Sequence, residues 1–140
     1  MSNALRAGTT YFALVFVVGF LLGTVRTLVL ASSVGDFIAV AIELPVILAI
    51  SWIVCKRVLL RYLVRPAFIE RMVVGGSALL FLLGSEAILS VTLAGRSWME
   101  HFGLYKTLPS LLGLFGQILF ALFPLIQSRR FNGDDHPIRP

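Results

Sequence analysis

The chain has 140 residues, a length that suits a single domain. Hydrophobic residues make up 58% of it and charged residues 14%, whereas soluble domains average about 45–50% and about 25%. Both departures favour a protein that is embedded in lipid.

Four apolar runs are long enough to cross a bilayer, which takes about 20 residues in a helix. They extend over Thr10–Ala31, Phe37–Cys55, Met72–Leu93 and Thr107–Ser128, each boundary being approximate. Backbone amides in lipid must bond internally, and barrel strands would alternate in polarity, so these runs predict helices. The expected fold class is all-α: a polytopic membrane protein with an antiparallel four-transmembrane-helix bundle.

Little of the chain lies outside these runs. We expect a short cytoplasmic N-terminus at 1–9, a basic cytoplasmic loop at 56–71 and a cytoplasmic tail at 129–140. No soluble catalytic domain fits into segments of this size.

The first apolar run ends in a sequence, Val29-Leu30-Ala31, that resembles a signal-peptide cleavage site. The run is longer than the apolar core of a typical signal peptide, and it contains Arg26. We therefore expect it to be retained as the first membrane helix.

Basic residues are distributed unevenly around the four runs. Those on the side of the N-terminus are Arg6, Lys56, Arg57, Arg61, Arg65, Arg71, Arg129, Arg130 and Arg139. The other side has only Arg96 and Lys106. The positive-inside rule then places both termini in the cytoplasm of a plasma (inner) membrane. This distribution also argues against nucleic acid as a partner.

The loop at 56–71 has a pattern of its own, because Arg57, Arg61 and Arg65 are spaced by four and share one helical face. We expect the second helix to continue to about Arg65, where Pro66 stops it. Together with Lys56, this face is either a snorkelling extension among lipid headgroups or a docking site for anionic lipid or an acidic partner.

The segment between the third and fourth runs contains Trp98, Phe102 and Tyr105, which are typical of the aromatic belt at a membrane surface. Glu100 and His101 lie beside them, and we expect both to be solvated. His101 would titrate near neutral pH, which makes it a weak candidate for a pH sensor.

Three charged residues lie within the apolar runs: Arg26 in the first, Glu43 in the second and Glu86 in the third. At 1.5 Å per residue, each lies about 8–11 Å below the predicted outer end of its helix. Ionisable residues in a membrane normally face a partner or a cavity, so we predict a buried polar cluster. Arg26 and Glu43 are the expected ion pair, because a short turn makes their helices neighbours.

Two further polar residues are expected to line this cluster. Ser90 shares a helix face with Glu86, and Gln117 lies on a small, polar face of the fourth helix, from which it could hydrogen-bond to Glu86. Arg26 can neutralise only one glutamate. We therefore expect one of Glu43 and Glu86, with Glu86 preferred, to be protonated or to titrate near neutral pH.

Small residues suggest where helices approach each other. Gly19 and Gly23 form a Gly-x-x-x-Gly contact motif on the face of Arg26, and Gly113 lies on the small face of the fourth helix. We predict these three glycines to be helix-packing residues. Pro45, which follows Glu43 by two residues, is expected to kink the second helix.

The sequence contains no zinc-protease motif, no nucleophile elbow and no phosphate-binding loop. No histidine lies in the middle of a run, which argues against axial haem ligation. A single cysteine, Cys55, excludes a disulfide within the chain. We therefore predict no catalytic residues, no metal and no cofactor, and we do not expect an enzyme.

Two functions remain open at this point. The first is a small transport or ion/proton-conducting component that uses the Arg26, Glu43 and Glu86 cluster, with Glu86 as proton carrier. The second is a non-catalytic accessory or assembly subunit of a larger membrane complex, in which the cluster is structural. Besides the lipid bilayer, the expected partners are anionic lipids, further copies of the chain or other subunits of such a complex.

Overall fold

The computed structural model describes residues 1–131, with side chains up to residue 127. The elements are α1 (Ser2–Val25), the π-helical segment η1 (Arg26–Leu30), α2 (Ala31–Val34), α3 (Asp36–Arg61), α4 (Phe68–Thr92), α5 (Trp98–Leu104) and α6 (Leu108–Phe131). No strand occurs among the described residues. The part of the predicted tail from residue 132 onward lies outside the described residues.

Four helical stretches are long and apolar enough to cross a membrane. They are Ser2–Val34, which joins α1, η1 and α2, followed by Asp36–Arg61, Phe68–Thr92 and Leu108–Gln127. Large apolar side chains on their outer faces are exposed, as expected for surfaces that contact lipid. The predicted all-α membrane bundle is confirmed.

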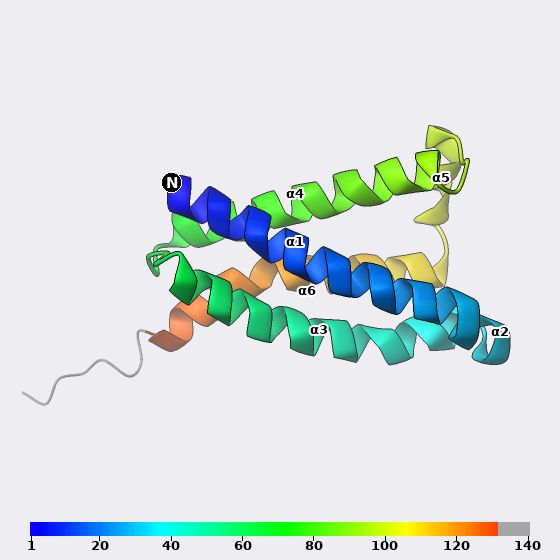
Figure 1. The fold of residues 1–140 in the computed structure, drawn as a ribbon, viewed down its shortest axis with the longest axis horizontal. Coiled ribbons are helices and arrows are strands. Elements are labelled where there is room, and N and C mark those ends of the chain that lie inside the picture. The colour runs from blue at the N-terminus through cyan, green and yellow to red at the C-terminus, as the bar shows by residue number, and fades with distance from the viewer. Residues whose placement is uncertain (132–140) are drawn as a thin grey trace, which may run out of the picture.

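The four helices form a ring in which α1 and α6 lie on opposite corners (Figure 1). Each of these two helices packs against both α3 and α4. The N-terminus, the α3–α4 connection and the C-terminal part of α6 lie at one end of the bundle, here called the N-terminal end. The opposite end, with α2 and α5, is called the far end. Helices α3 and α4, although consecutive in the sequence, therefore lie on diagonally opposite corners of the ring.

The tightly packed core occupies the half of the bundle towards the N-terminal end. Its buried residues are Ala4, Ala7, Tyr11, Val15, Cys55, Val58, Leu59, Val64, Val74, Ala78, Phe120 and Phe123. Two glycines allow the closest helix contacts there. A Cβ on Gly8 would collide with the Ser77 side chain and the Val74 backbone of α4, and one on Gly75 would collide with the Ala121 backbone of α6.

The side chain of Tyr11 joins α1 to α6, the helix on the opposite corner of the ring. Pro124 lies inside α6 and has no backbone N–H, so the Phe120 carbonyl loses its helical donor. The fully buried Tyr11 hydroxyl donates to that carbonyl at 3.0 Å. The Tyr11 and Phe120 rings also stack, with centroids 4.3 Å apart. One side chain of α1 thus compensates for a proline in α6.

Helix α3 ends at Arg61, so the prediction that it continues to about Arg65 is wrong. The helix is closed by Leu63, which adopts a left-handed backbone conformation with φ 50°. Around this residue the amide of Val64 donates to the carbonyl of Leu59 at 3.1 Å. This is the Schellman motif, which usually has glycine at the left-handed position. Because leucine occupies that position here, the sequence does not reveal the motif.

The helices also extend beyond several predicted boundaries. The stretch 1–9 is helical from Ser2 onward, and within the predicted loop 56–71 only 62–67 lies outside helices. Hydropathy marks only the part of a helix that lies in hydrocarbon. The backbone hydrogen bonds of a helix continue beyond that part, which explains the difference.

Candidate functional site

A cavity of about 570 Å³ lies between the helices, and it contains four of the five predicted cluster residues. It extends from Val15, Ser51 and Phe120 near the middle of the bundle towards the far end. Thr24, Thr27 and Leu28 also line it and are exposed, so the cavity is open on that side. Towards the N-terminal end it meets the packed core.

Arg26 and Glu43 form an ion pair inside this cavity. The distance between Arg26 Nε and Glu43 Oε2 is 3.0 Å, and the side chains are 34% and 16% exposed. The pair joins the helix of α1 to α3, and it leaves the other guanidinium nitrogens of Arg26 available for further contacts.

Glu86 and Gln117 form the second polar contact in the cavity. The side-chain nitrogen of Gln117 donates to both carboxyl oxygens of Glu86, each at 2.7 Å. Gln117 lies on α6 and Glu86 on α4, so this contact links the other two corners of the ring. Glu86 also interacts electrostatically with Arg26. Residues from all four spanning helices therefore meet at one site.

The depths of these side chains agree. Arg26, Glu43, Glu86 and Gln117 are separated by six to nine residues from the far ends of their helical stretches. At 1.5 Å per residue this is about 9–14 Å. The cavity therefore places one polar layer within the half of the bundle nearer the far end.

Arg26 begins a π-helical turn, for which the sequence has no signature. The amide of Ala31 donates to the carbonyl of Arg26, five residues earlier, instead of to residue 27. The Thr27 hydroxyl donates to the Gly23 carbonyl at 2.8 Å beside this turn. A single π turn inserted in a helix is frequent at functional sites, because it reorients the side chains next to it.

Ser90 is the one predicted cluster residue that does not line the cavity. It lies one helical turn beyond Glu86 towards the far end of α4, and its buried hydroxyl has no hydrogen-bond partner. The structure therefore separates Ser90 from the polar layer.

The predicted helix-packing glycines have a different environment from the one expected. A Cβ on Gly113 would meet nothing within 4 Å, and one on Gly23 would meet only the Arg26 guanidinium, at 3.8 Å. Gly19 approaches Ile47 of α3 at ordinary contact distance, 3.8 Å. Among the described residues no helix of this chain approaches Gly23 or Gly113 closely, so their role in helix packing stays a prediction. All three glycines line the cavity, and their missing side chains leave its space free.

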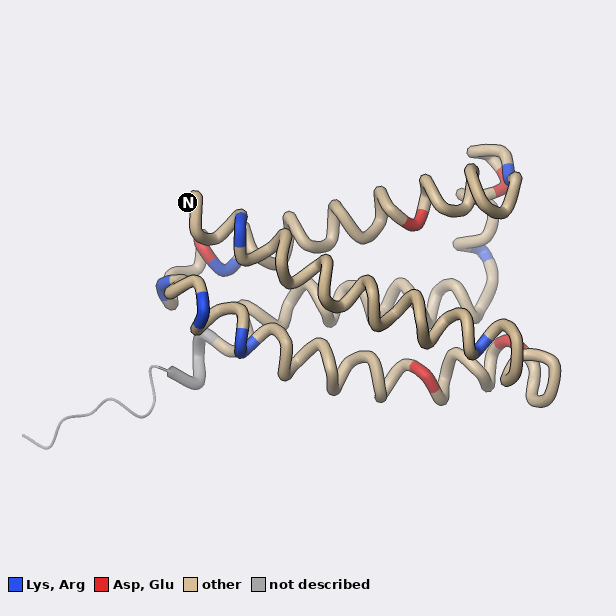
Figure 2. Tube along the Cα trace, in the orientation of Figure 1, with Lys and Arg blue, Asp and Glu red and all other residues tan. Residues whose placement is uncertain are grey.

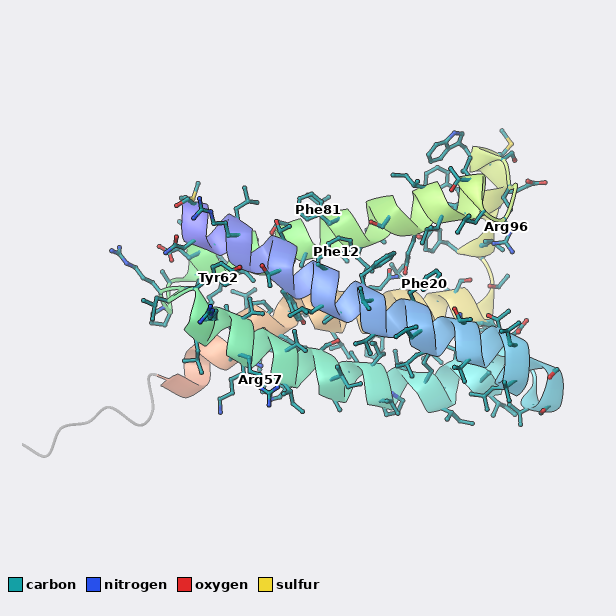
Figure 3. The ribbon with its side chains drawn as sticks, viewed as in Figure 1. Phe12, Phe20, Arg57, Tyr62, Phe81 and Arg96 are labelled. Carbon is teal, nitrogen blue, oxygen red and sulfur yellow. The ribbon has the colours of Figure 1, made fainter. Side chains whose placement is uncertain are left out.

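The basic residues of the α3–α4 region divide into two groups. Lys56, Arg57, Arg61 and Arg65 are exposed, and Figure 3 shows Arg57 pointing away from the bundle. Most Lys and Arg positions gather at the N-terminal end (Figure 2).

Arg71, by contrast, is 4% exposed. Its guanidinium donates to the carbonyls of Arg65 at 3.1 Å and Val64 at 3.2 Å, which fixes the connection between the two helices. Its position at the start of an apolar run, among other basic residues, gave no signal of this role.

Helix α5 covers part of the far end, where a loop was expected. It begins with a capping box, in which the Ser97 hydroxyl accepts from the Glu100 amide and the Glu100 carboxylate accepts from the Ser97 amide. These bonds hold the pKa of Glu100 below its usual range. The helix turns His101 inward to 7% exposure, against the rings of Phe102 and Tyr105, so the expectation of a solvated His101 is wrong.

Tyr105 directly follows α5 and is half-buried. Burial and, to a lesser degree, the Glu86 carboxylate raise the pKa of Tyr105.

The fold and the site together define a four-helix membrane protein with an internal polar cavity. Comparison of the chain with known protein families, with curated proteins and with solved structures found no significant match. Among the described residues, no group of three or more His, Cys, Asp or Glu side chains could hold a metal ion.

Proposed function

We propose that the protein is a small transport component of a cell membrane, with the cavity as its solute-binding site. The observation that carries this proposal is the asymmetry of the bundle. The cavity is open around Thr24, Thr27 and Leu28, whereas the core around Tyr11 closes the other half. A purely structural charge cluster does not need about 570 Å³ of open space beside it.

The direction of opening follows from the charges. The exposed basic residues at the N-terminal end favour a cytoplasmic position for that end in a plasma (inner) membrane. The cavity then opens towards the outer side. In this proposal the structure corresponds to an outward-facing state, and transport requires a second state in which the core half opens.

Glu86 is the proposed proton carrier. It is the cavity carboxylate that forms no ion pair with a described residue, because the ion pair of Arg26 is formed with Glu43. A carboxylate that is held by an uncharged amide can exchange a proton without breaking an ion pair. A chain of this size is proposed to complete its pathway as a homo-oligomer.

The test is proton flux in liposomes that contain the purified protein. We expect an imposed pH gradient to decay faster than in protein-free liposomes, and Glu86→Gln to abolish at least about nine-tenths of the added rate, as expected for loss of a general acid-base group. Asp36→Asn is the matched control, since Asp36 is exposed at the far end and does not line the cavity. Equal rates for Glu86→Gln and the unaltered protein would rule out the proton-carrier role.

The exposed residues Lys56, Arg57, Arg61 and Arg65 are proposed to bind anionic lipid headgroups. Replacing Arg57 and Arg61 by Gln should reduce the number of anionic lipids that remain bound in native mass spectrometry. Arg96→Gln at the opposite end serves as the control. An unchanged lipid count would contradict this assignment.

A second candidate function is that of an accessory subunit in a larger membrane complex. The observation that favours it is a pair of exposed glycines on α4, Gly76 and Gly84, which have no neighbour within 4 Å of a Cβ position. Such small residues let a partner helix approach closely. Purification from native membranes distinguishes the two candidates, because a stoichiometric larger complex would contradict a stand-alone transporter.

A further inference from the structure

The charges that line the cavity are unbalanced. Among the described residues, its ionisable lining consists of Arg26, Glu43 and Glu86. Arg26 and Glu43 pair at 3.0 Å, whereas Glu86 is bonded only to the uncharged amide of Gln117. The Gln117 amide donates to both oxygens of Glu86, which is the arrangement expected when the carboxyl group is ionised and can only accept hydrogen bonds. The ionised cavity therefore carries one negative charge that no side chain neutralises.

The walls of the cavity are mostly apolar. Phe16, Phe20 and Phe120 contribute rings to it, and the remaining lining is dominated by aliphatic side chains. The hydroxyls of Thr24, Thr27 and Ser51 donate to carbonyls of their own helices. The volume of about 570 Å³ lies within the range of about 300–1,000 Å³ that is usual for small-molecule sites.

These properties discriminate between kinds of solute. A hard metal ion prefers about six or more oxygen ligands, whereas the only carboxylates among the described residues that line this cavity are Glu43, which is paired with Arg26, and Glu86. An anion bound by Arg26 would lie close to the carboxylates of Glu43 and Glu86, which would repel it. A cation with an apolar body would gain a counter-charge from Glu86 and dry contacts from the walls.

We propose that the cavity binds organic monocations with an apolar body, such as quaternary or protonated amines, with the Glu86 carboxylate as counter-charge and a proton as competitor. This assignment rests on the proposed function and names its substrate class. When the cation enters, the Glu86 carboxyl releases one proton, so the total charge of the site is the same before and after binding. Arg26, Glu43 and Gln117 are the other charged and amide side chains that line the cavity around this exchange.

The test uses tetraphenylphosphonium, which has four phenyl groups and no titratable proton. Radiolabelled probe is titrated into the purified protein in nanodiscs of zwitterionic lipid, over a pH series that brackets neutrality. We expect saturable binding whose affinity rises up to about tenfold per pH unit while Glu86 is protonated in the free protein, and then levels off. Tetraphenylborate, which has the same shape and the opposite charge, should not compete.

Three variants complete the test. Glu86→Gln should weaken binding at least about tenfold, the effect of losing roughly 1.4 kcal/mol, and should remove its pH dependence. Asp36→Asn, the matched change outside the cavity, should bind like the unaltered protein. Gly113→Leu keeps Glu86 but fills free space, so it should also weaken binding. Elution as a single species in size-exclusion chromatography confirms that each variant is folded.

The possible outcomes separate this inference from the transport proposal. Equal binding of both probe ions, or pH-independent binding to the unaltered protein, overturns the inference. If the probe does not bind but proton flux depends on Glu86, the assignment of the substrate class is overturned and the transport proposal is not. Glu86-dependent binding without any flux supports the site and contradicts transport.

Discussion

At the scale of single residues, the sequence reveals charges more readily than it reveals uncharged polar contacts. Arg26, Glu43 and Glu86 are conspicuous because ionisable groups are costly in hydrocarbon. Tyr11 and Arg71 are just as important for the fold, but near helix ends both residue types are usual surface anchors. Only the tertiary structure shows that both are buried and bonded to backbone carbonyls, Tyr11 to a distant helix and Arg71 to the α3–α4 connection.

The bond from Tyr11 to the Phe120 carbonyl gives a prediction at this scale. Tyr11→Phe should reduce the free energy of unfolding by about 1 kcal/mol, the usual size of a hydrogen bond between membrane helices. In the background of Pro124→Ala the same change should lower the free energy of unfolding by less, because a backbone N–H at position 124 can donate to the Phe120 carbonyl. Reversible unfolding in mixed detergent micelles measures all four corners of this double-mutant cycle. Additive effects would show that the proline and the tyrosine are not coupled.

At the scale of helices and turns, hydropathy locates the four spans but not all their ends or their irregularities. The left-handed Leu63 ends α3 earlier than Pro66 would, and no glycine marks that position. The π-helical turn at Arg26 also has no sequence signature, because it depends on how the helix meets its neighbours. Helix α5 did have a signal, the capping-box spacing of Ser97 and Glu100, which the aromatic composition of the segment obscured.

Two adjacent glycines of α4 provide a matched test of helix packing. Gly75→Ala would place a methyl group against the Ala121 backbone of α6 and should lower the free energy of unfolding by about 1–3 kcal/mol, as overpacking does. Gly76→Ala meets no atom within 4 Å and should be neutral or stabilise the helix by up to about 1 kcal/mol. The same unfolding assay compares the two. Similar losses for both would mean that α4 and α6 do not approach as described.

At the scale of the whole molecule, the sequence predicts four alternating helices but not their order around the bundle. Short loops place α1 beside α3, whereas the diagonal position of α3 and α4 arises only from packing. That order brings Arg26, Glu43, Glu86 and Gln117 from four helices into one cavity. It also explains why glycines that were expected to contact helices leave free space instead.

The central claim is that the cavity opens to the outer side and is closed to the cytoplasm. The most direct measurement is the accessibility of single cysteines to a membrane-impermeant thiol reagent, in a Cys55→Ala background. Gly113→Cys lies in the cavity, and Ala78→Cys lies in the closed core half. We expect modification of Gly113→Cys in intact cells, no modification of it in inside-out vesicles, and protection of Ala78→Cys from both sides. Modification of Gly113→Cys only from the cytoplasmic side, or equal modification of both positions, would contradict it.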